Sequence, residues 1–271
     1  MADVHPTAIV GKGAELADDV SVGPYTIIEA GVRLGAGVKV HAHVVVGGRT
    51  MIGSGSEIFP FASVGLPPQD KKYHGEASRL EIGKNCTIRE HVTINPGTEG
   101  GGMVTRIGDD CLILVGAHVA HDCQVGNNVL LVNHATLGGH CRIDDYAILG
   151  GLSAVHQFVR IGESSFVGGM SGVENDVIPF GSAIGNRAEL GGLNIVGLTR
   201  RGFSREAIHQ LRRAYRTLFG PEGTLKERLA DVEEEFSGDE NVRKIVGFIR
   251  AGGDRAICTP RRGVSSSNGT A

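Results

Sequence analysis

Residues 107–149 read IGDDCLILVGAHVAHDCQVGNNVLLVNHATLGGHCRIDDYAIL, and this stretch decides the fold. Every sixth residue in it, from Ile107 to Leu149, is isoleucine, valine or leucine. The position four residues after each aliphatic one is small or β-branched, as at Ala117, Cys123 and Val129. Glycine often follows the aliphatic residue, where a turn favours a residue without a Cβ atom. A period of six with one aliphatic and one small position is typical of a parallel β-helix.

The same pattern extends over most of the chain. It holds without exception from position 4 to 64, from 82 to 94 and, shifted by one residue, from 107 to 173. These hexads resemble those of the hexapeptide-repeat family, which implies three short strands and 18 residues per coil. The left hand also comes from this resemblance, because parallel crossovers are right-handed in general. We therefore expect an all-β left-handed parallel β-helix, triangular in section, over residues 1–186.

Two insertions and a change of period divide the rest of the chain. The hexads are interrupted by loops near residues 65–80 (GLPPQDKKYHGEASRL) and 99–106. Insertions on a solenoid usually project from one face and often carry binding groups. From Ser204 the apolar residues recur at helical spacing, so we expect a C-terminal α-helical domain over residues 187–252. Its later helices should cover about 224–236 and 241–251, and residues 253–271 should form a disordered tail.

Composition excludes several functional classes. The 271 residues carry 27 Lys and Arg against 30 Asp and Glu, and a net charge of −3 argues against a nucleic-acid-binding protein. No apolar run is long enough to span a membrane, and the N-terminus lacks the features of a signal peptide. Five cysteines in such a chain indicate free thiols and a cytoplasmic location. Those at the small inward position of the hexad are Cys86, Cys111, Cys123 and Cys141.

Histidines are concentrated between positions 118 and 157. Because one coil adds 18 residues, His121, Gly139 and Gln157 should form one column along the prism, with coils about 4.8 Å apart. Asp122 and His140 should form the column beside it. A histidine, a carboxylate and a second histidine therefore converge on one corner. None of them occupies an inward position, so we expect all to face solvent or a partner.

This arrangement suits general-base catalysis. Imidazole exchanges a proton near neutral pH, so His121 can accept one from an alcohol. Asp122 can fix the tautomer of His121 and stabilise its protonated form. Gly139 has no side chain, so its backbone N–H can approach a developing oxyanion. No serine or cysteine is clearly paired with His121, which favours direct attack by the acceptor, and a non-enzymatic solenoid would give no reason for the column.

A zinc site is the alternative interpretation of the same histidines. His118 and His121, with a third histidine, have the spacing of a three-histidine zinc site, as in the carbonic anhydrases built on a left-handed β-helix. However, His118 lies on the far side of a turn position from His121. Asp122 also suits a hydrogen-bonded pair better than a metal site, so we expect no metal.

Longer motifs make a family resemblance specific. The segments HVAHDCQVGNNVLLVNHATLGGH, GGLSAVHQFVRIG and NIVGLTRRGFSREAI, with the PPQDKKYHGE insertion, resemble the acyl-[acyl-carrier-protein]–UDP-N-acetylglucosamine O-acyltransferase family over about residues 4–249. The resemblance implies transfer of a fatty acyl group, expected to be 3-hydroxylated, from acyl carrier protein to the 3-hydroxyl of UDP-N-acetylglucosamine. This is the first step of lipid A biosynthesis. It also implies a homotrimer with active sites between the prisms and no cofactor.

The resemblance assigns roles residue by residue. His121 would be the base, Asp122 its orienting carboxylate and Gly139 the oxyanion donor. The positions that match substrate-binding groups, the last three near the uridine nucleotide, are Gln69, Asp70, Lys72, His118, His140, Gln157, Asn194, Arg200 and Arg201. The positions that match the acyl-chain groove are Gly151, Gly169 and Arg187. Six arginines between positions 200 and 216 would steer an acidic carrier protein towards the helices.

The chain departs from the family pattern at three positions. Asn95 and Arg187 stand where many members have histidine, and Val196 replaces a glutamate near the nucleotide. Gly169 leaves space where a larger side chain would shorten the acyl groove, so we expect chains of roughly 12 to 16 carbons. The N-acyltransferase of the same pathway is a competing interpretation with the same fold. It normally carries an extra N-terminal domain, whereas the hexads here begin at position 4. Whether the acceptor group is a 3-hydroxyl or a 3-amino group stays open.

Overall fold

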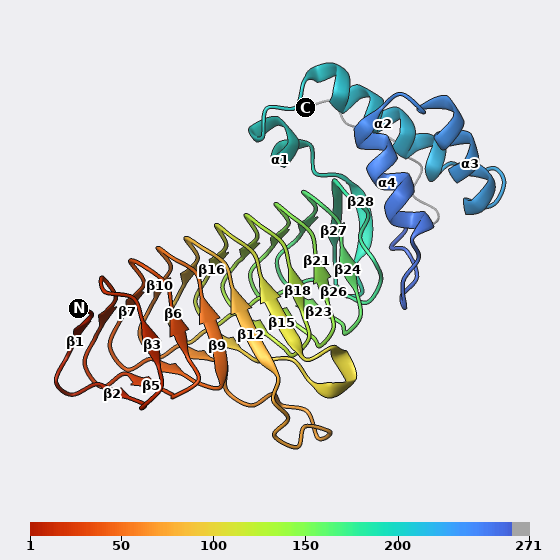
Figure 1. Ribbon diagram of the computed structural model, residues 1–271. Helices are drawn as coiled ribbons and strands as arrows, with labels where there is room; N and C mark the ends of the chain where they lie inside the picture. The colour runs from red at the N-terminus through yellow and green to blue at the C-terminus, as the bar shows by residue number, and fades with distance from the viewer. Residues whose placement is uncertain (262–271) are drawn as a thin grey trace.

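The computed structural model describes residues 1–261 as a three-sided prism of short parallel strands with a group of helices at one end (Figure 1). Each coil visits three sheets in turn, which we call sheets 1, 2 and 3, and the corners between them are corners 1/2, 2/3 and 3/1. Sheet 1 contains β1 (Asp3–Val4), β4 (Ser21–Val22), β7 (Lys39–Val40), β10 (Glu57–Ile58), β13 (Thr87–Ile88), β16 (Leu112–Ile113), β19 (Leu130–Leu131), β22 (Ile148–Leu149), β25 (Phe166–Val167), β27 (Gly181–Ile184) and β28 (Glu189–Leu193). Sheet 2 contains β2 (Ile9–Val10), β5 (Ile27–Ile28), β8 (Val45–Val46), β11 (Ser63–Val64), β14 (Thr93–Ile94), β17 (His118–Val119), β20 (Thr136–Leu137), β23 (Ala154–Val155) and β26 (Gly172–Val173). Sheet 3 contains β3 (Glu15–Leu16), β6 (Arg33–Leu34), β9 (Arg49–Ile52), β12 (Arg79–Ile82), β15 (Val104–Ile107), β18 (Gln124–Val125), β21 (Arg142–Ile143) and β24 (Arg160–Ile161).

The hexad explains this architecture directly. Most strands use two of the six residues, and the other four turn the corner. Strands β17 and β20 pair in parallel with Val119 opposite Leu137, a separation of one 18-residue coil. The aliphatic residues fill the interior, where Leu131, Leu137 and Leu149 are all 0% exposed. The β-helix with C-terminal helices that the sequence predicts is confirmed, and the four cysteines expected to point inward are buried.

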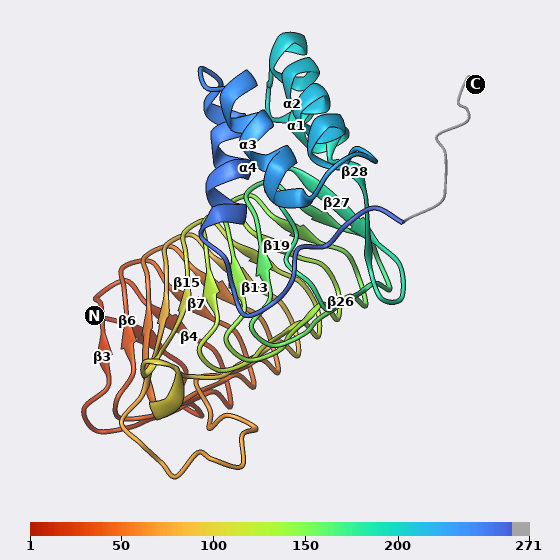
Figure 2. The ribbon, with the colours of Figure 1, turned by 90° about the vertical axis from the view of Figure 1, so that its right-hand side faces the viewer.

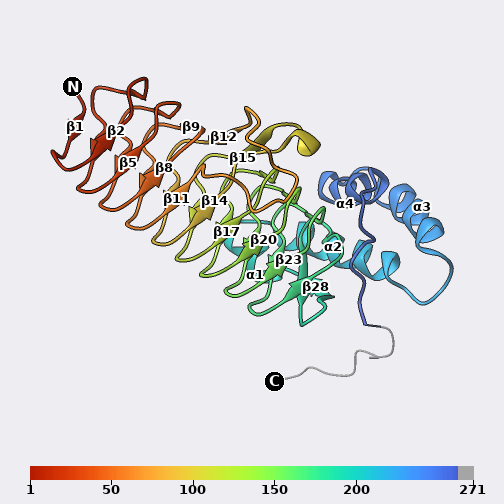
Figure 3. The same cartoon turned by 90° about the horizontal axis from the view of Figure 1, so that it is seen from below.

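Both insertions leave the prism at corner 2/3. The first lies between β11 and β12, and the second, which contains a short 3-10 helix (Glu99–Gly101), lies between β14 and β15. Seen from below, the two loops lie side by side (Figure 3). The N–H of Glu99 joins them by donating to Glu76 Oε1 at 3.2 Å. Both insertions therefore project from the same corner, which also carries His121.

The C-terminal helices begin after an antiparallel strand. Strand β27 continues sheet 1 in parallel with β25, and β28 then pairs antiparallel with β27, although its residues fall within the range expected to be helical. The helices are α1 (Ile195–Arg200), α2 (Arg205–Leu218), α3 (Leu225–Glu235) and α4 (Glu240–Arg250). Ser204, where the sequence predicts the helical spacing to begin, caps α2, and its hydroxyl accepts from the N–H of Ala207 at 3.1 Å. Within residues 1–261, no helix is both long and apolar enough to cross a membrane.

The expectation of a disordered tail from residue 253 is wrong for its first part. Beyond α4 the chain returns to the prism and crosses the outside of its last coils (Figure 2). Cys258 is 1% exposed, and its thiol donates to the carbonyl of Ala188. Hydrogen bonds of the strand type join Ala256 and Cys258 to Asp176. No periodic pattern in residues 253–258 predicts this return, and residues 262–271 of the expected tail lie outside the described residues.

Candidate active site

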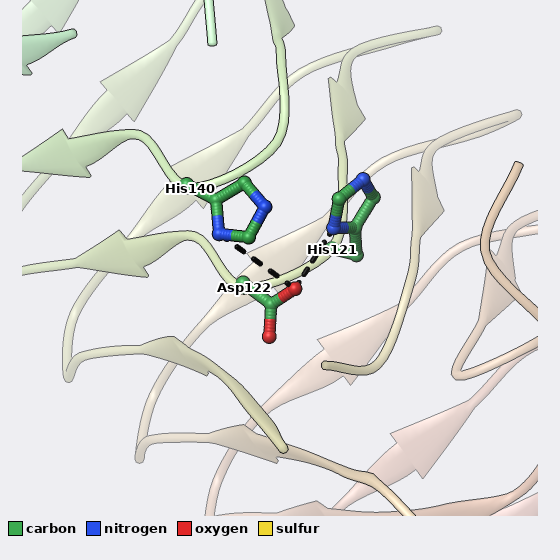
Figure 4. A group of neighbouring side chains, drawn as sticks. All are labelled: His121, Asp122 and His140. Atoms are coloured by element: carbon green, nitrogen blue, oxygen red, sulfur yellow. Dashed lines mark hydrogen bonds and ion pairs between the residues drawn. The ribbon is translucent and has the colours of Figure 1, made fainter. Parts of the chain in front are cut away.

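His121 and Asp122 lie in the turn between β17 and β18, at corner 2/3, and form a hydrogen-bonded pair (Figure 4). Asp122 has a left-handed backbone conformation with φ 62°, and its N–H donates to Thr105 Oγ1 at 2.8 Å. His121 Nδ1 lies 2.8 Å from Asp122 Oδ2. Because a carboxylate only accepts, Nδ1 carries the proton and Nε2 presents a lone pair. The imidazole is therefore held in the tautomer that a general base needs.

Asp122 does not face solvent, and the expectation that it does is wrong. The second insertion folds over the carboxylate, whose side chain is 0% exposed. Thr98 donates twice, from its N–H to Oδ1 at 2.9 Å and from its hydroxyl to Oδ2 at 2.6 Å. A Cβ atom on Gly101 would lie 2.0 Å from the carboxyl carbon, so glycine is required for this close approach. Asp122 is thus a buried carboxylate with hydrogen bonds at both oxygens, as a buried charge requires.

The role of Thr98 can be tested by removing its hydroxyl alone. Thr98→Val keeps the shape and the backbone N–H donor but leaves Asp122 Oδ2 without its 2.6 Å partner. We expect kcat to fall about tenfold, with little change in the KM for the acyl donor or the acceptor. The lost bond orients Asp122, which is expected to act in the transition state. Thr98→Ser, which retains the hydroxyl, should keep most of the activity. Equal rates for the two variants would show that the hydroxyl has no such role.

Gly139 lies one coil beyond His121 in the predicted column. A Cβ atom at this position would come within 2.6 Å of His121 Cε1 and 2.7 Å of its Nε2, so the imidazole edge rests against the glycine. Within residues 1–261, no acceptor takes the Gly139 N–H. A base and a free N–H donor are therefore neighbours, the combination that acyl transfer through an oxyanion requires. Gln157, the next residue of the column, is exposed.

His140 and His118 flank the pair from two sides. The His140 ring stacks on Phe158 with centroids 4.5 Å apart, and its Nδ1 lies 3.9 Å from Asp122 Oδ2. Burial lowers the pKa of His140, although the Asp122 carboxylate opposes the shift. His118 Nδ1 lies 2.7 Å from Thr93 Oγ1, and burial, followed by the neighbouring His121, lowers the pKa of His118. Both rings are thus neutral at neutral pH and available as hydrogen-bonding groups.

The first insertion brings a second carboxylate to the base. Asp70 Oδ2 lies 4.0 Å from His121 Nε2, on the side opposite to Asp122. The N–H of Lys72 donates to Asp70 Oδ1 at 3.0 Å, while the side chains of Lys72 and Gln69 are exposed. Asn95 holds the root of the loop, since its Nδ2 donates to the carbonyl of Leu66 at 3.0 Å. Asn95, one of the three residues that depart from the family pattern, therefore anchors this insertion.

A metal ion fits this site less well than the hydrogen bonds do. His121, Asp122 and His140 offer ligand atoms within 4.8 Å of one another, which is compatible with a small cation. However, tetrahedral zinc with bonds of about 2.1 Å holds its ligand atoms about 3.4 Å apart. His121 Nδ1 and Asp122 Oδ2 are closer than this, at 2.8 Å, and Thr98 already donates to both carboxylate oxygens. The donor set is that of a hydrogen-bonded base.

The expected nucleotide-binding residues lie at corner 3/1. They line a cavity of about 740 Å³ between sheet 1 and α1, whose wall includes the exposed Val196. Asn194 caps α1 by accepting from the N–H of Gly197 at 3.1 Å. Arg201 lies over the ring of Tyr146 at 3.7 Å and donates to Ser164, so it forms part of the wall. Arg200 is exposed at the same cavity and is free to meet an anion.

The expected acyl-groove residues lie at corner 1/2. Gly151 and Gly169 stack in neighbouring coils, and a Cβ atom on Gly169 would lie 3.2 Å from the carbonyl oxygen of Gly151. Arg187 is not the next residue of this column, because the register shortens after β25; it lies in the turn between β27 and β28 and pairs with Glu174. The adjacent column exposes apolar side chains, since Leu152 is 60% and Met170 is 75% exposed. This corner offers a narrow glycine-lined path beside apolar groups.

A single prism does not bring all the expected residues together. His121, Asp122, Gly139, His140 and the first insertion share corner 2/3, whereas the nucleotide and acyl groups occupy the other two corners. Sequence reasoning also missed Thr93, Thr98 and Thr105, which hold the histidines and the carboxylate. Thr98 lies in an insertion, where the hexad spacing places no side chain.

Comparisons with known proteins give one consistent set of relatives. The family model described as UDP N-acetylglucosamine O-acyltransferase, domain 2, matches residues 176–258, and that of the bacterial transferase hexapeptide matches residues 105–139. A curated acyl-[acyl-carrier-protein]–UDP-N-acetylglucosamine O-acyltransferase of Azorhizobium caulinodans is 56% identical and covers 97% of both chains. One from Methylobacterium radiotolerans is 70% identical over 75% of each chain.

Solved structures give the same result. The UDP-N-acetylglucosamine acyltransferase of Campylobacter jejuni is 41% identical with a TM-score of 0.89, covering 96% of this chain and 100% of its own. That of Francisella novicida is 32% identical with a TM-score of 0.91, covering 98% of this chain and 100% of its own. The likeness therefore includes both the prism and the helices.

Proposed function

The chain belongs to the family of acyl-[acyl-carrier-protein]–UDP-N-acetylglucosamine O-acyltransferases, and on this premise we propose which of its residues carry out each step. Its fold is the left-handed parallel β-helix of that family. The enzyme transfers a fatty acyl group from acyl carrier protein to UDP-N-acetylglucosamine, the first step of lipid A biosynthesis. The relatives named above are O-acyltransferases, which decides against the N-acyltransferase alternative. The acceptor in our proposal is the 3-hydroxyl of the sugar.

The mechanism is direct attack on the thioester with general-base assistance. His121 Nε2 takes the proton of the 3-hydroxyl while its oxygen attacks the thioester carbonyl carbon. Asp122 stabilises the imidazolium that forms, and the Gly139 N–H donates to the oxyanion of the tetrahedral intermediate. When the intermediate collapses, the carbon–sulfur bond breaks and the imidazolium returns its proton to the departing thiolate. The observation that carries this proposal is the Nδ1–carboxylate bond of 2.8 Å, which leaves Nε2 free beside Gly139.

A homotrimer would complete the active site. The base lies at corner 2/3, the cavity at corner 3/1 and the glycine-lined path at corner 1/2, so one prism presents each part on a different edge. A substrate that touches all three parts therefore needs corners from neighbouring prisms. In this arrangement Gln69, Asp70, Lys72, His118, His140 and Gln157 contact the sugar, the diphosphate or the acyl donor. Asn194, Arg200 and Arg201 lie near the uridine nucleotide.

The acyl carrier protein would dock on α2. Arg205, Arg212 and Arg216 are exposed on this helix, whereas Arg213 is paired with Glu235. Opposite charge on an acidic carrier would steer its approach to the C-terminal end of the prism. We also place the reaction in the cytoplasm, where the five free cysteines would remain reduced.

The proposed function is tested by the products of purified enzyme. The enzyme is incubated with UDP-N-acetylglucosamine and a series of acyl carrier thioesters, with and without a 3-hydroxyl group, and the products are weighed by mass spectrometry. We expect an alkali-labile ester with acyl chains of roughly 12 to 16 carbons, because Gly169 leaves the groove open. Gly169→Met should shift the preference to shorter chains. Exclusive transfer of a ten-carbon chain by the unmodified enzyme would contradict the groove assignment, and an alkali-stable amide would contradict the acceptor group.

A further inference from the structure

A C-terminal strap, residues 253–258, crosses corner 2/3 close to the proposed active site. It begins at Gly253, where a Cβ atom would lie 2.7 Å from Arg160 Nε and 2.8 Å from Asp176 Oδ2. The backbone N–H of Asp176 donates to the carbonyl of Ala256, and the N–H of Cys258 donates to the carbonyl of Asp176, both at 2.8 Å. Anchored in this way at both ends, the strap has a fixed position over the last coils of the prism (Figure 2).

The strap places one cationic side chain, that of Arg255, beside the column that contains His121 and Gln157. Arg255 Nη2 lies 2.7 Å from His156 Nδ1, and Arg255 Nε donates to the carbonyl of Gln157 at 3.0 Å. The Gln157 carbonyl also lies 3.2 Å from His156 Nδ1, but the guanidinium is closer and only donates, so Nδ1 accepts from Arg255 and Nε2 carries the proton. Arg255 therefore fixes both the tautomer of His156 and the carbonyl of Gln157. Its planar fork matches the two acceptors better than a single ammonium group would.

Residues 156–157, which Arg255 contacts, form a turn between His121 and the C-terminal helices. Gln157 is one coil beyond Gly139 and two coils beyond His121, in the direction of α4. Helix α4 packs against the same coil, where Arg160 lies 4.3 Å over the ring of Phe248 and donates to its carbonyl at 3.2 Å. Residues 156–157 therefore lie on the C-terminal side of His121, towards the end of the prism at which the proposed carrier docks.

We propose that Arg255 is a positioning residue for the acyl donor, acting through the tautomer of His156 and the conformation of the 156–157 turn. This role rests on the proposed acyl transfer at His121. Arg255 keeps His156 Nε2–H as a hydrogen-bond donor, which suits the amide and thioester carbonyl oxygens of the donor. The proposed nucleotide cavity near α1 is lined by other residues, and neither Arg255 nor His156 is among them.

Steady-state kinetics separate this role from a structural one. Arg255→Ala should raise KM for the acyl carrier thioester about tenfold while leaving KM for UDP-N-acetylglucosamine within about twofold. Arg255→Lys, which retains a donor but loses the fork, should recover part of the loss. Arg250→Ala removes an exposed arginine paired with Glu233 and should behave like the unmodified enzyme. An unchanged donor KM in Arg255→Ala, or an equal rise in both KM values, would overturn the proposal.

A spectroscopic measurement tests the clamp without relying on activity. Nitrogen-15 chemical shifts of the His156 ring, assigned with His156→Gln, should report the Nε2–H tautomer in the full-length enzyme and a mixture in Arg255→Ala. The same tautomer in both proteins would also overturn the proposal. If the unmodified enzyme transferred no acyl group while the tautomer changed as expected, the proposed function would fail and the clamp would stand.

Discussion

Replacing His121 with alanine is expected to lower kcat by about 10²- to 10⁴-fold, the usual contribution of a general base. In the proposed mechanism the imidazole accepts the proton of the attacking hydroxyl at Nε2, since Nδ1 is bound to Asp122. KM for UDP-N-acetylglucosamine should change little, since the lost interaction acts in the transition state. The measurement is steady-state acyl transfer across a range of both substrates.

Two observations keep this result interpretable. His121 lies in a turn and is not part of the hydrophobic core, so removing its ring should leave the β-helix folded, which circular dichroism and the thermal midpoint would verify. His5→Ala provides the matched control, because the His5 ring is exposed in the first coil and hydrogen-bonds only to Thr7 among residues 1–261. A His121→Ala enzyme with near-normal kcat would rule out the general-base mechanism.

Gly139→Ala should be nearly as damaging, although it adds only a methyl group. The new Cβ atom would lie 2.6 Å from His121 Cε1, well inside a normal contact, so the ring must move away. A displacement of about 1 Å at a reacting group costs on the order of 10²-fold in rate, and the amide would also be less accessible to the oxyanion. Kinetics combined with a crystal structure of the variant would show both effects.

The control for this variant is another glycine with room for a side chain. Gly100 lies in the second insertion, and a Cβ atom there would meet nothing within 4 Å. Gly100→Ala should therefore retain normal activity, while Gly139→Ala loses it at a similar thermal midpoint. If Gly139→Ala kept both its rate and the position of the His121 ring, the contact between the two residues would have no part in catalysis.

The prism was predictable because its core is periodic. One aliphatic residue every six positions buries Leu131 and Leu149 in successive turns of the same sheet, and the coil length follows from that period. The same arithmetic places His140 beside Asp122, and the structure has this pair at 3.9 Å. Sites built from residues one coil apart are therefore accessible to sequence reasoning.

The two segments that lie over the site, the second insertion and the C-terminal strap, could not be predicted in the same way. Thr98 reaches Asp122 from an insertion, and Arg255 reaches His156 from a strap beyond the helices. Neither segment repeats, so no spacing rule places its side chains against the prism. The burial of Asp122 was missed for this reason, since a turn position on a bare prism would face solvent.

The most direct test of the central claim is a crystal structure of the enzyme with UDP-N-acetylglucosamine bound. The claim is that His121 removes the proton of the sugar hydroxyl and that the backbone N–H of Gly139 donates to the oxyanion. We predict the 3-hydroxyl oxygen within hydrogen-bond distance of His121 Nε2, about 2.6–3.2 Å, on the side of the ring that faces Gly139. A sugar bound with this hydroxyl beyond the reach of Nε2, or directed to another side chain, would contradict the mechanism.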